Sequence, residues 1–380
     1  MNSIKLRGAA AIAVLASMGV ALAQTPPQPA VPASVPSRDT TYIAPDGTAY
    51  ITRVIPVPTT VSPEAQKLIG RQISESDVPS TLAEDRRATD LHRAKVGKIA
   101  LAKYPAQVAE GSIAGVPVTI VTPLKGVSPA RPFVLINVHG GAYEFDCCSL
   151  VESIPIASLM QAEVIAVRYR LAPEHPFPAG VDDVIAVYRQ VLKHHRPGEI
   201  AIYGTSSGAV MTGEVAMKLK MLGLPEPAAL GIFSGFGDFS QQGDSRSFFT
   251  AAGLGGELTP NAGLIDVQRA YVGSMRLGDP VLSPMRGDLS DLPPTLFLTS
   301  TRDWFLSGTS LFDRAMLRAG DDPELVVFEG LNHGFWVNPT LPESDEAYHT
   351  AVKFFQKHLK AVGPGVQAQH EHRAGRPLRR

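Results

Sequence analysis

The motif Gly204-Thr-Ser-Ser-Gly208 places a serine between two glycines, directly after an apolar run of strand character and before a helical pattern. A serine exposed on a sharp turn from strand to helix can act as a nucleophile, because the turn aims its hydroxyl away from the chain. Such a turn needs residues with little or no side chain two positions before and two after the serine. Ser206 has glycines at both positions and Ser207 does not. The spacing therefore predicts Ser206 as a catalytic nucleophile.

A serine hydroxyl needs a base to take its proton, and the base needs an acid to hold its tautomer. Among the histidines after Ser206, His333 is the one in a glycine-bounded loop directly after a strand-like run. Asp303 follows the strand-like run Thr295–Thr299 and is the predicted acid, and Glu329 is a weaker alternative. The order Ser206, Asp303, His333 is the order of an α/β-hydrolase triad.

The segment His139-Gly-Gly-Ala142 ends another strand-like run and could bind the oxyanion that forms when an acyl carbon becomes tetrahedral. The backbone N–H groups of Gly140 and Gly141 can face a substrate without obstruction by side chains. The N–H of Ser207 is the expected further donor. His139 precedes the nucleophile and is expected to brace this loop rather than to act as the base.

Short apolar runs alternate with helical patterns from about residue 105 onward. The expected strands are Val118–Thr122, Val134–Val138, Val164–Tyr169, Ile200–Tyr203, Ala229–Phe233, Thr295–Thr299 and Leu325–Phe328. The expected helices are Val181–Lys193, Ala209–Met221, Gly308–Arg318 and Asp345–Leu359. This alternation predicts a mostly parallel sheet with helices on both faces, whose reactive groups lie on loops at the carboxyl ends of the strands.

Two segments of the expected α/β domain stand out from this pattern. Val118–Thr122 follows a proline and carries alternating threonines, so it is expected at an edge of the sheet. Gly235–Pro280 is rich in glycine and is expected to form a loop above the sheet, near the site.

The N-terminal part of the chain divides by composition. Residues 1–23 carry two basic residues, an apolar run and Ala21-Leu-Ala23, a pattern typical of a secretory signal, so we expect a periplasmic or secreted protein. A membrane anchor is the alternative, but the run is shorter than a bilayer requires. Residues 24–41 are rich in proline and are expected to form a linker.

Three further regions follow the linker. Residues 42–104 form the expected N-terminal region, with two or three amphipathic helices from Ser62 onward that either pack on the core or form a lid. Residues 105–361 form the expected catalytic domain. Residues 362–380 are expected to be a disordered basic tail.

Composition excludes several classes of function. The net charge is −1 and the pI is about 6.8, so no broad positive field favours binding to nucleic acid or to an anionic membrane. The cysteines are the adjacent pair Cys147 and Cys148, which supplies no disulfide framework. We expect them to be buried apolar side chains, with a redox or metal role as the alternative. No metal or cofactor is expected.

Together these motifs resemble the hormone-sensitive-lipase family of α/β hydrolases, in its Gly-Thr-Ser branch. The segments that carry the resemblance are His139–Tyr143, Tyr169–Pro178, Gly204–Gly208, Asp279–Pro284, the Asp303 loop and Asn332–Phe335. The resemblance implies an α/β-hydrolase fold with an N-terminal helical cap, and a small-molecule ester of short to medium acyl chain as substrate. A lactone hydrolase is the close alternative. A non-catalytic receptor of the same fold is less favoured, because His333 is present.

The chain departs from the family pattern at several positions. Thr205 stands where an aspartate is frequent, Ser207 where alanine is usual, and Ser307 where a second acid commonly follows the catalytic aspartate. Ala142 takes the place of the third glycine of the family motif. The segment after Tyr143 lacks the usual small residues, and we expect it to alter the substrate pocket.

Overall fold

The computed structural model describes residues 39–70, 80–127, 132–256, 258 and 263–360. The predicted secretory signal, nearly all of the proline-rich linker and the basic tail lie outside these residues. Those assignments, and the periplasmic or secreted location that depends on them, stay predictions.

An eight-stranded sheet forms the centre of the protein, in the order β10-β9-β8-β7-β5-β6-β4-β3. Its strands are β3 (Ala106–Ile113), β4 (Val116–Pro123), β5 (Val134–Val138), β6 (Glu163–Val167), β7 (Ile200–Thr205), β8 (Ala229–Phe233), β9 (Thr295–Arg302) and β10 (Glu324–Asn332). Strands β5 to β10 pair in parallel, whereas β4 pairs antiparallel with both β3 and β6. The mostly parallel sheet expected from the sequence is therefore confirmed.

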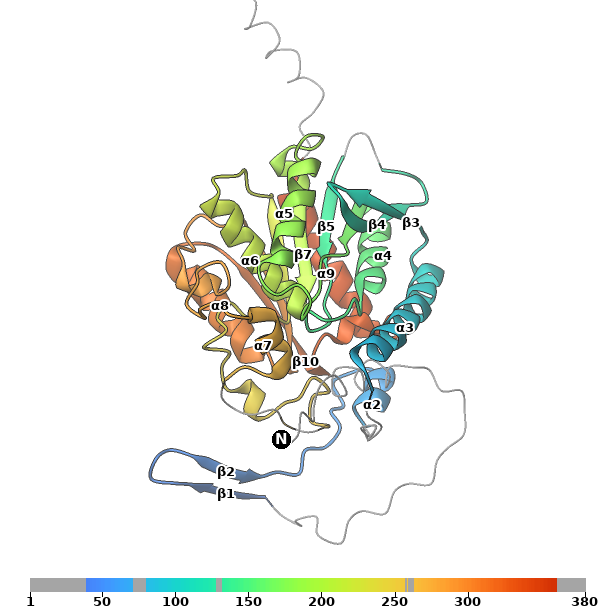
Figure 1. Cartoon of the computed structure of the whole chain (residues 1–380). Coiled ribbons are helices and arrows are strands. Elements are labelled where there is room, and N and C mark those ends of the chain that lie inside the picture. Colours follow the sequence, from blue (N-terminus) through green and yellow to red (C-terminus); the bar gives the residue numbers. More distant parts are fainter. Residues whose placement is uncertain (1–38, 71–79, 128–131, 257, 259–262, 361–380) are drawn as a thin grey trace, which may run out of the picture.

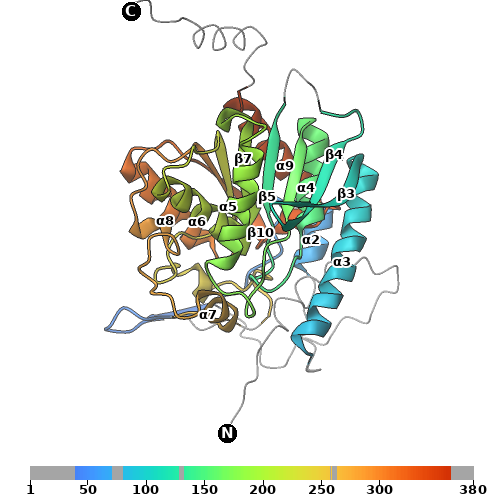
Figure 2. The ribbon, with the colours of Figure 1, turned by 45° about the horizontal axis from the view of Figure 1, so that its top comes forward.

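Helices cover both faces of the sheet (Figures 1 and 2). One buried apolar cluster joins the sheet to α4 (Ser149–Met160) and α9 (Pro342–His358), and α3 (Leu82–Lys103) packs outside α4. A second cluster joins the opposite face to α5 (Ala179–Val191), α6 (Ser207–Met221) and α8 (Leu306–Ala319). Strands β5 and β7 are buried along their whole length, because both of their faces are covered.

The prediction that Val118–Thr122 lies at an edge of the sheet is wrong. Strand β4, which contains Val118–Thr122, lies inside the sheet, and β3 forms the edge. Most side chains of β3 are exposed, and its sequence accordingly mixes small and polar residues and has no apolar run. The sequence therefore carries no signal for this strand. A two-residue turn with positive φ at Ala114 and Gly115 joins β3 to β4, which is the geometry of a tight hairpin.

Two helices were not expected from the sequence. Helix α4 is buried almost all round and contains Pro155, so it shows neither a polar stripe nor uninterrupted helix formers. Helix α7 (Asp266–Val272) lies within the segment expected to be a loop. That segment is therefore partly helical.

The described residues of the N-terminal region form the two helices α2 (Pro63–Ile69) and α3, within the stretch where two or three were expected. Ser62 caps α2, and Thr81 forms a capping box with Glu84 at the start of α3. Before them a hairpin of β1 (Thr40–Ile43) and β2 (Ala49–Thr52) extends away from the sheet (Figure 1).

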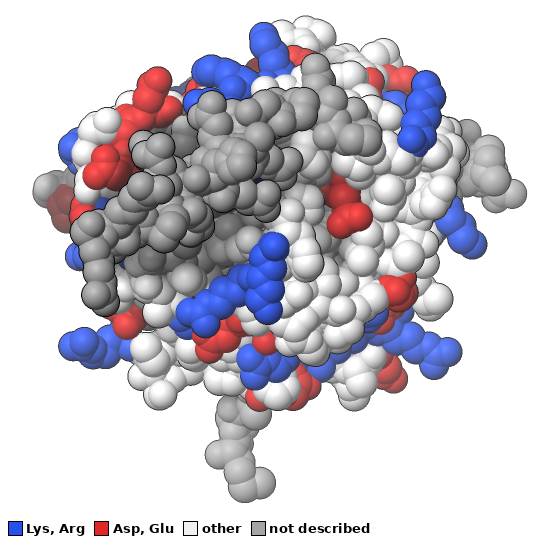
Figure 3. All heavy atoms as spheres, turned by 90° about the horizontal axis from the view of Figure 1, so that it is seen from above, with Lys and Arg blue, Asp and Glu red and all other residues white. Residues whose placement is uncertain are grey.

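Charged side chains of both signs are interspersed on the face seen from above (Figure 3). In the described part of the chain, no helix has the length and apolar character needed to span a bilayer.

We expect Gly208→Ala to destabilise the fold severely. A Cβ at this position would lie 1.9 Å from the Val138 carbonyl oxygen, which belongs to the neighbouring strand. Backbone cannot move aside cheaply, so the cost should exceed about 4 kcal/mol, at the top of the range for single substitutions. Denaturant unfolding measures it. Gly278→Ala is the matched control, because nothing lies within 4 Å of its added Cβ, and a similar loss in both variants would contradict this account.

Candidate active site

The nucleophile elbow forms where β7 runs into α6. Ser206 has φ 58° and ψ −122°, a conformation that is costly for a residue with a side chain and is typical of functional sites. Its N–H donates to the Phe233 carbonyl at 2.9 Å. A Cβ on Gly204 would lie 2.6 Å from the carbonyl group of Gly208 in α6, so strand and helix approach as closely here as the sequence pattern predicts.

The structure brings the three predicted triad residues together. His333 follows β10, and its Nε2 lies 2.8 Å from Ser206 Oγ. Its Nδ1 lies 2.8 Å from Asp303 Oδ1, and Asp303 follows β9. Glu329 is exposed and accepts a hydrogen bond from Thr60. The weaker alternative for the acid is thus not in contact with His333.

Asp303 is completely buried and held from several sides. Its Oδ2 accepts hydrogen bonds from the hydroxyls of Ser234 and Thr299, and its Oδ1 accepts one from the Phe305 N–H at 2.9 Å. Burial by itself raises the pKa of this carboxyl. The charge of His333 and the hydrogen bonds outweigh burial and hold the pKa below its ordinary value. Asp303 therefore stays ionised at neutral pH, as an acid that orients a histidine requires.

The oxyanion loop, residues 139–142, lies against the nucleophile. A Cβ on Gly140 would lie 3.3 Å from Ser206 Cβ, and one on Gly141 would lie 2.2 Å from the Phe145 carbonyl oxygen. The Gly140 N–H, however, donates to Cys148 Sγ at 3.2 Å. Gly140 was expected to be an oxyanion donor, and the structure gives its N–H another partner.

His139 braces the oxyanion loop from behind. Its ring is buried and stacks on Tyr169, with centroids 4.2 Å apart. The Tyr169 hydroxyl donates to the His139 carbonyl at 2.8 Å. His139 has no contact with the triad among the hydrogen bonds of the described residues, in keeping with the bracing role expected for it.

The cysteine pair lies directly behind this loop. Cys147 and Cys148 are buried and free, with their sulfurs 2.7 Å apart. Burial raises the pKa of the Cys148 thiol well above its ordinary value. Among the described residues, no three His, Cys, Asp or Glu side chains are grouped so that they could hold a metal ion.

Aromatic side chains from the long segment after β8 pack beside the oxyanion loop. Tyr143 stacks on Tyr271 of α7 with centroids 3.7 Å apart, and Phe239 lies next to both. All three rings are buried. The segment expected to lie near the site therefore reaches it through α7, and it fills space beside the loop.

Several residues that support the site were not found from the sequence. Ser234 and Thr299 hold Asp303, Cys148 holds the Gly140 N–H, and Trp336 donates its indole N–H to Thr205 at 2.9 Å. Ser234 carried one usable signal, since it directly follows a predicted strand and so lies at the carboxyl edge of the sheet. Thr299 likewise ends a predicted strand, four residues before Asp303, whereas the contact of Trp336 with Thr205 joins segments 131 residues apart.

Comparisons with known proteins agree with this geometry. A family model described as an alpha/beta hydrolase fold matches residues 135–337. An acetyl-hydrolase of Streptomyces hygroscopicus is 30% identical over 272 residues, which cover 69% of this chain and 89% of that protein. An esterase of Acinetobacter venetianus is 27% identical over 225 residues, covering 58% of this chain and 74% of that protein.

Solved esterase structures superpose on this chain. One esterase crystal structure superposes with a TM-score of 0.70 at 30% identity, covering 81% of this chain and 98% of that one. An esterase from the bacterial hormone-sensitive lipase family has a TM-score of 0.67 at 26% identity, covering 79% of this chain and 99% of that one.

Proposed function

Because this chain belongs to the hormone-sensitive-lipase family of α/β hydrolases, we propose that it hydrolyses carboxylic esters through Ser206, His333 and Asp303. The observation that supports this most is the hydrogen-bonded relay, in which 2.8 Å separates Ser206 Oγ from His333 Nε2 and 2.8 Å separates His333 Nδ1 from Asp303 Oδ1. This is the geometry of a nucleophile, a base and an orienting acid.

In the proposed mechanism Ser206 Oγ attacks the ester carbonyl while His333 Nε2 takes its proton. The tetrahedral intermediate collapses when His333 returns that proton to the leaving alcohol, which yields an acyl-enzyme. Water then attacks the acyl carbon, again with His333 as the base. Asp303 keeps the proton on Nδ1 and stabilises the imidazolium.

The oxyanion donors that we assign are the N–H groups of Gly141, Ala142 and Ser207. Within the described residues the N–H groups of Gly141 and Ala142 have no backbone acceptor, and Ser207 directly follows Ser206 at the start of α6. The Gly140 N–H would have to leave Cys148 to take part. Each donor aimed at the developing charge contributes on the order of 10²- to 10³-fold to turnover.

We propose an acyl chain of short to medium length. Two observations support this: a relative is named an acetyl-hydrolase, and Tyr143, Phe239 and Tyr271 pack into the space beside the oxyanion loop. Buried, stacked rings cannot turn aside for a long chain without loss of packing.

A substrate panel tests the proposed function. We expect kcat/KM for p-nitrophenyl esters to be highest with acetyl to hexanoyl chains and to fall at least tenfold at dodecanoyl. Lactones should be assayed in parallel by proton release. Faster turnover of lactones than of every ester would contradict the ester assignment but keep the triad, and no turnover of either would favour a non-catalytic receptor.

A further inference from the structure

Glu152 of α4 is an ionisable side chain that lies between the oxyanion loop and the nucleophile elbow. These two parts of the site must keep a fixed position relative to each other. Glu152 is 1% exposed and lies behind the oxyanion loop and the nucleophile strand. Asn137, two residues before His139 on β5, donates its Nδ2–H to Glu152 Oε2 at 2.8 Å. A buried carboxylate is expensive unless it is paired, so its retention here calls for a role.

Two more contacts join Glu152 to the catalytic loops. On the strand that leads to the elbow, the Tyr203 hydroxyl donates to the Glu152 carbonyl at 3.2 Å, and the Thr205 hydroxyl and the Cys148 thiol are near enough to the Glu152 carboxyl to lower its pKa. Cys148 Sγ in turn accepts the Gly140 N–H at 3.2 Å. Glu152 therefore reaches the oxyanion loop through Cys148 and the strand before the elbow through Tyr203.

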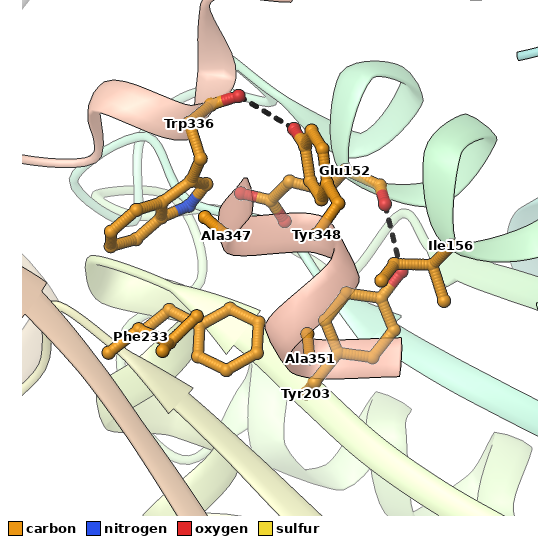
Figure 4. Close-up of a pocket in the computed structure, with 9 residues that line it drawn as sticks. Glu152, Ile156, Tyr203, Phe233, Trp336, Ala347, Tyr348 and Ala351 are labelled. Carbon is orange, nitrogen blue, oxygen red and sulfur yellow. Dashed lines mark hydrogen bonds between the residues drawn. The ribbon is translucent and has the colours of Figure 1, made fainter. Parts of the chain in front are cut away.

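A cavity of about 10 Å³ borders the same carboxyl (Figure 4). Aromatic side chains surround it, and its lining residues are Glu152, Ile156, Tyr203, Phe233, Leu298, Trp336, Ala347, Tyr348 and Ala351. In the described part of the chain Glu152 Oε1 has no hydrogen-bond partner. The volume is sufficient for at most about one water molecule, so bulk solvent does not stabilise the charge of Glu152.

We propose that Glu152 is a positioning residue: its ionised carboxyl accepts the Asn137 hydrogen bond on the strand before the oxyanion loop, its backbone carbonyl accepts the Tyr203 hydrogen bond on the strand before the elbow, and these contacts fix the donors relative to Ser206. It touches no substrate. The inference rests on the proposed function, because it concerns the same oxyanion loop and nucleophile.

The charge on Glu152 changes within the pH range in which activity can be assayed. Burial raises its pKa to about 7, against the hydrogen bonds that lower it. The titratable groups around it do not change charge there: the pKa of Asp146 lies below its ordinary value, and those of Cys147, Cys148, Tyr203 and Tyr348 are raised. Glu152 thus loses its acceptor strength as the pH falls through about 7.

The ionisation of Glu152 should support activity but lower the free energy of unfolding. Since the folded-state pKa lies above the ordinary value of 4.5, the folded protein holds a proton that the unfolded chain releases. Stability therefore falls as the pH rises from about 4.5 to 7 and stays lower above that. The ionised carboxyl is useful to the site at a cost to the fold, which a purely structural role would not produce.

Glu152→Gln tests this, with kcat and KM for p-nitrophenyl butyrate measured from pH 5.5 to 8.5. We expect kcat at pH 8 to fall roughly 10- to 100-fold with KM nearly unchanged, as for a displacement of catalytic groups by about 1 Å. The ratio of wild-type to variant kcat should approach 1 at pH 5.5, where Glu152 is already protonated. The Tm of the variant should exceed that of the wild type by about 2–5 °C at pH 8 and match it at pH 5.5.

Controls separate this inference from its premise. Asp313→Asn neutralises another buried carboxyl with a raised pKa, on α8, and should leave the kcat ratio near 1 at every pH. Asn137→Ala removes the hydrogen bond to the Glu152 carboxyl from its other partner and should lower kcat at pH 8 by a similar factor, even if Glu152→Gln fails to fold. Labelling by a fluorophosphonate reports whether Ser206 is still the nucleophile.

The possible results are decisive. A kcat ratio that does not change with pH, or a variant that loses activity and Tm together at pH 8, would overturn the role of Glu152. In either case a labelled Ser206 would leave the proposed function intact. An unlabelled Ser206 in the wild type would instead remove the premise.

Discussion

Ser206→Ala is expected to lower kcat for p-nitrophenyl butyrate by roughly 10⁵- to 10⁶-fold, with KM little changed. The substitution removes the oxygen that we propose forms the acyl-enzyme, and it leaves His333 without the Ser206 hydroxyl as a partner. Binding and the oxyanion donors should remain, so a small residual rate above water is expected. Steady-state kinetics with highly purified protein measure the loss.

Ser207→Ala distinguishes the two adjacent hydroxyls. The proposed contribution of Ser207 is its backbone N–H, which alanine keeps. The kcat of Ser207→Ala should therefore fall by less than tenfold. A fluorophosphonate should label the wild type and Ser207→Ala but not Ser206→Ala. If Ser207→Ala lost the larger share of activity, or if the label appeared on another residue, the assignment of the nucleophile would be wrong.

The elbow could be predicted from the sequence because its requirement is local. Gly204 and Gly208 are needed where strand and helix backbones touch, and both would clash with the Val138 carbonyl if they carried a Cβ. That requirement leaves a fixed spacing around Ser206. The same locality explains why strands buried on both faces, such as β5 and β7, were predicted within one or two residues of their bounds.

The contact between Asp303 and His333 could be predicted for a different reason. In a parallel sheet all carboxyl ends lie at one edge, so Asp303 and His333 come together although 30 residues separate them. The rule selects residues that directly follow strands, and it needs no knowledge of which strands are neighbours. Glu329 was the weaker alternative because it lies at the end of the strand that leads to His333 itself, and the structure places its side chain at the surface.

Contacts that depend on side-chain orientation could not be predicted. Nothing local in the sequence indicates that Cys148 accepts the Gly140 N–H, because the contact arises from the turn that leads into α4. That helix itself lacks the polar stripe by which helices are recognised, since it is buried between the sheet and α3. The role of Gly140 and the network around Glu152 therefore emerge only from the fold.

Asp303→Asn is expected to lower kcat by about 10⁴-fold while the protein remains folded. The carboxylate accepts from His333 Nδ1, from the Ser234 and Thr299 hydroxyls and from the Phe305 N–H. An amide offers one acceptor oxygen in place of two, and its NH₂ group turned towards His333 would favour the tautomer that carries the proton on Nε2. That nitrogen is the one that must accept the proton of Ser206.

The same argument predicts how the loss depends on pH and on the neighbouring carboxyl. Because hydroxide can replace the base, the residual activity of Asp303→Asn should rise with pH well above neutrality, whereas wild-type kcat should not need hydroxide in this way. Glu329→Gln should retain activity within about twofold, since Glu329 contacts Thr60 rather than His333. If Asp303→Asn kept activity within tenfold of the wild type and Glu329→Gln did not, the orienting acid would have to be Glu329, and the relay drawn through Asp303 would be wrong.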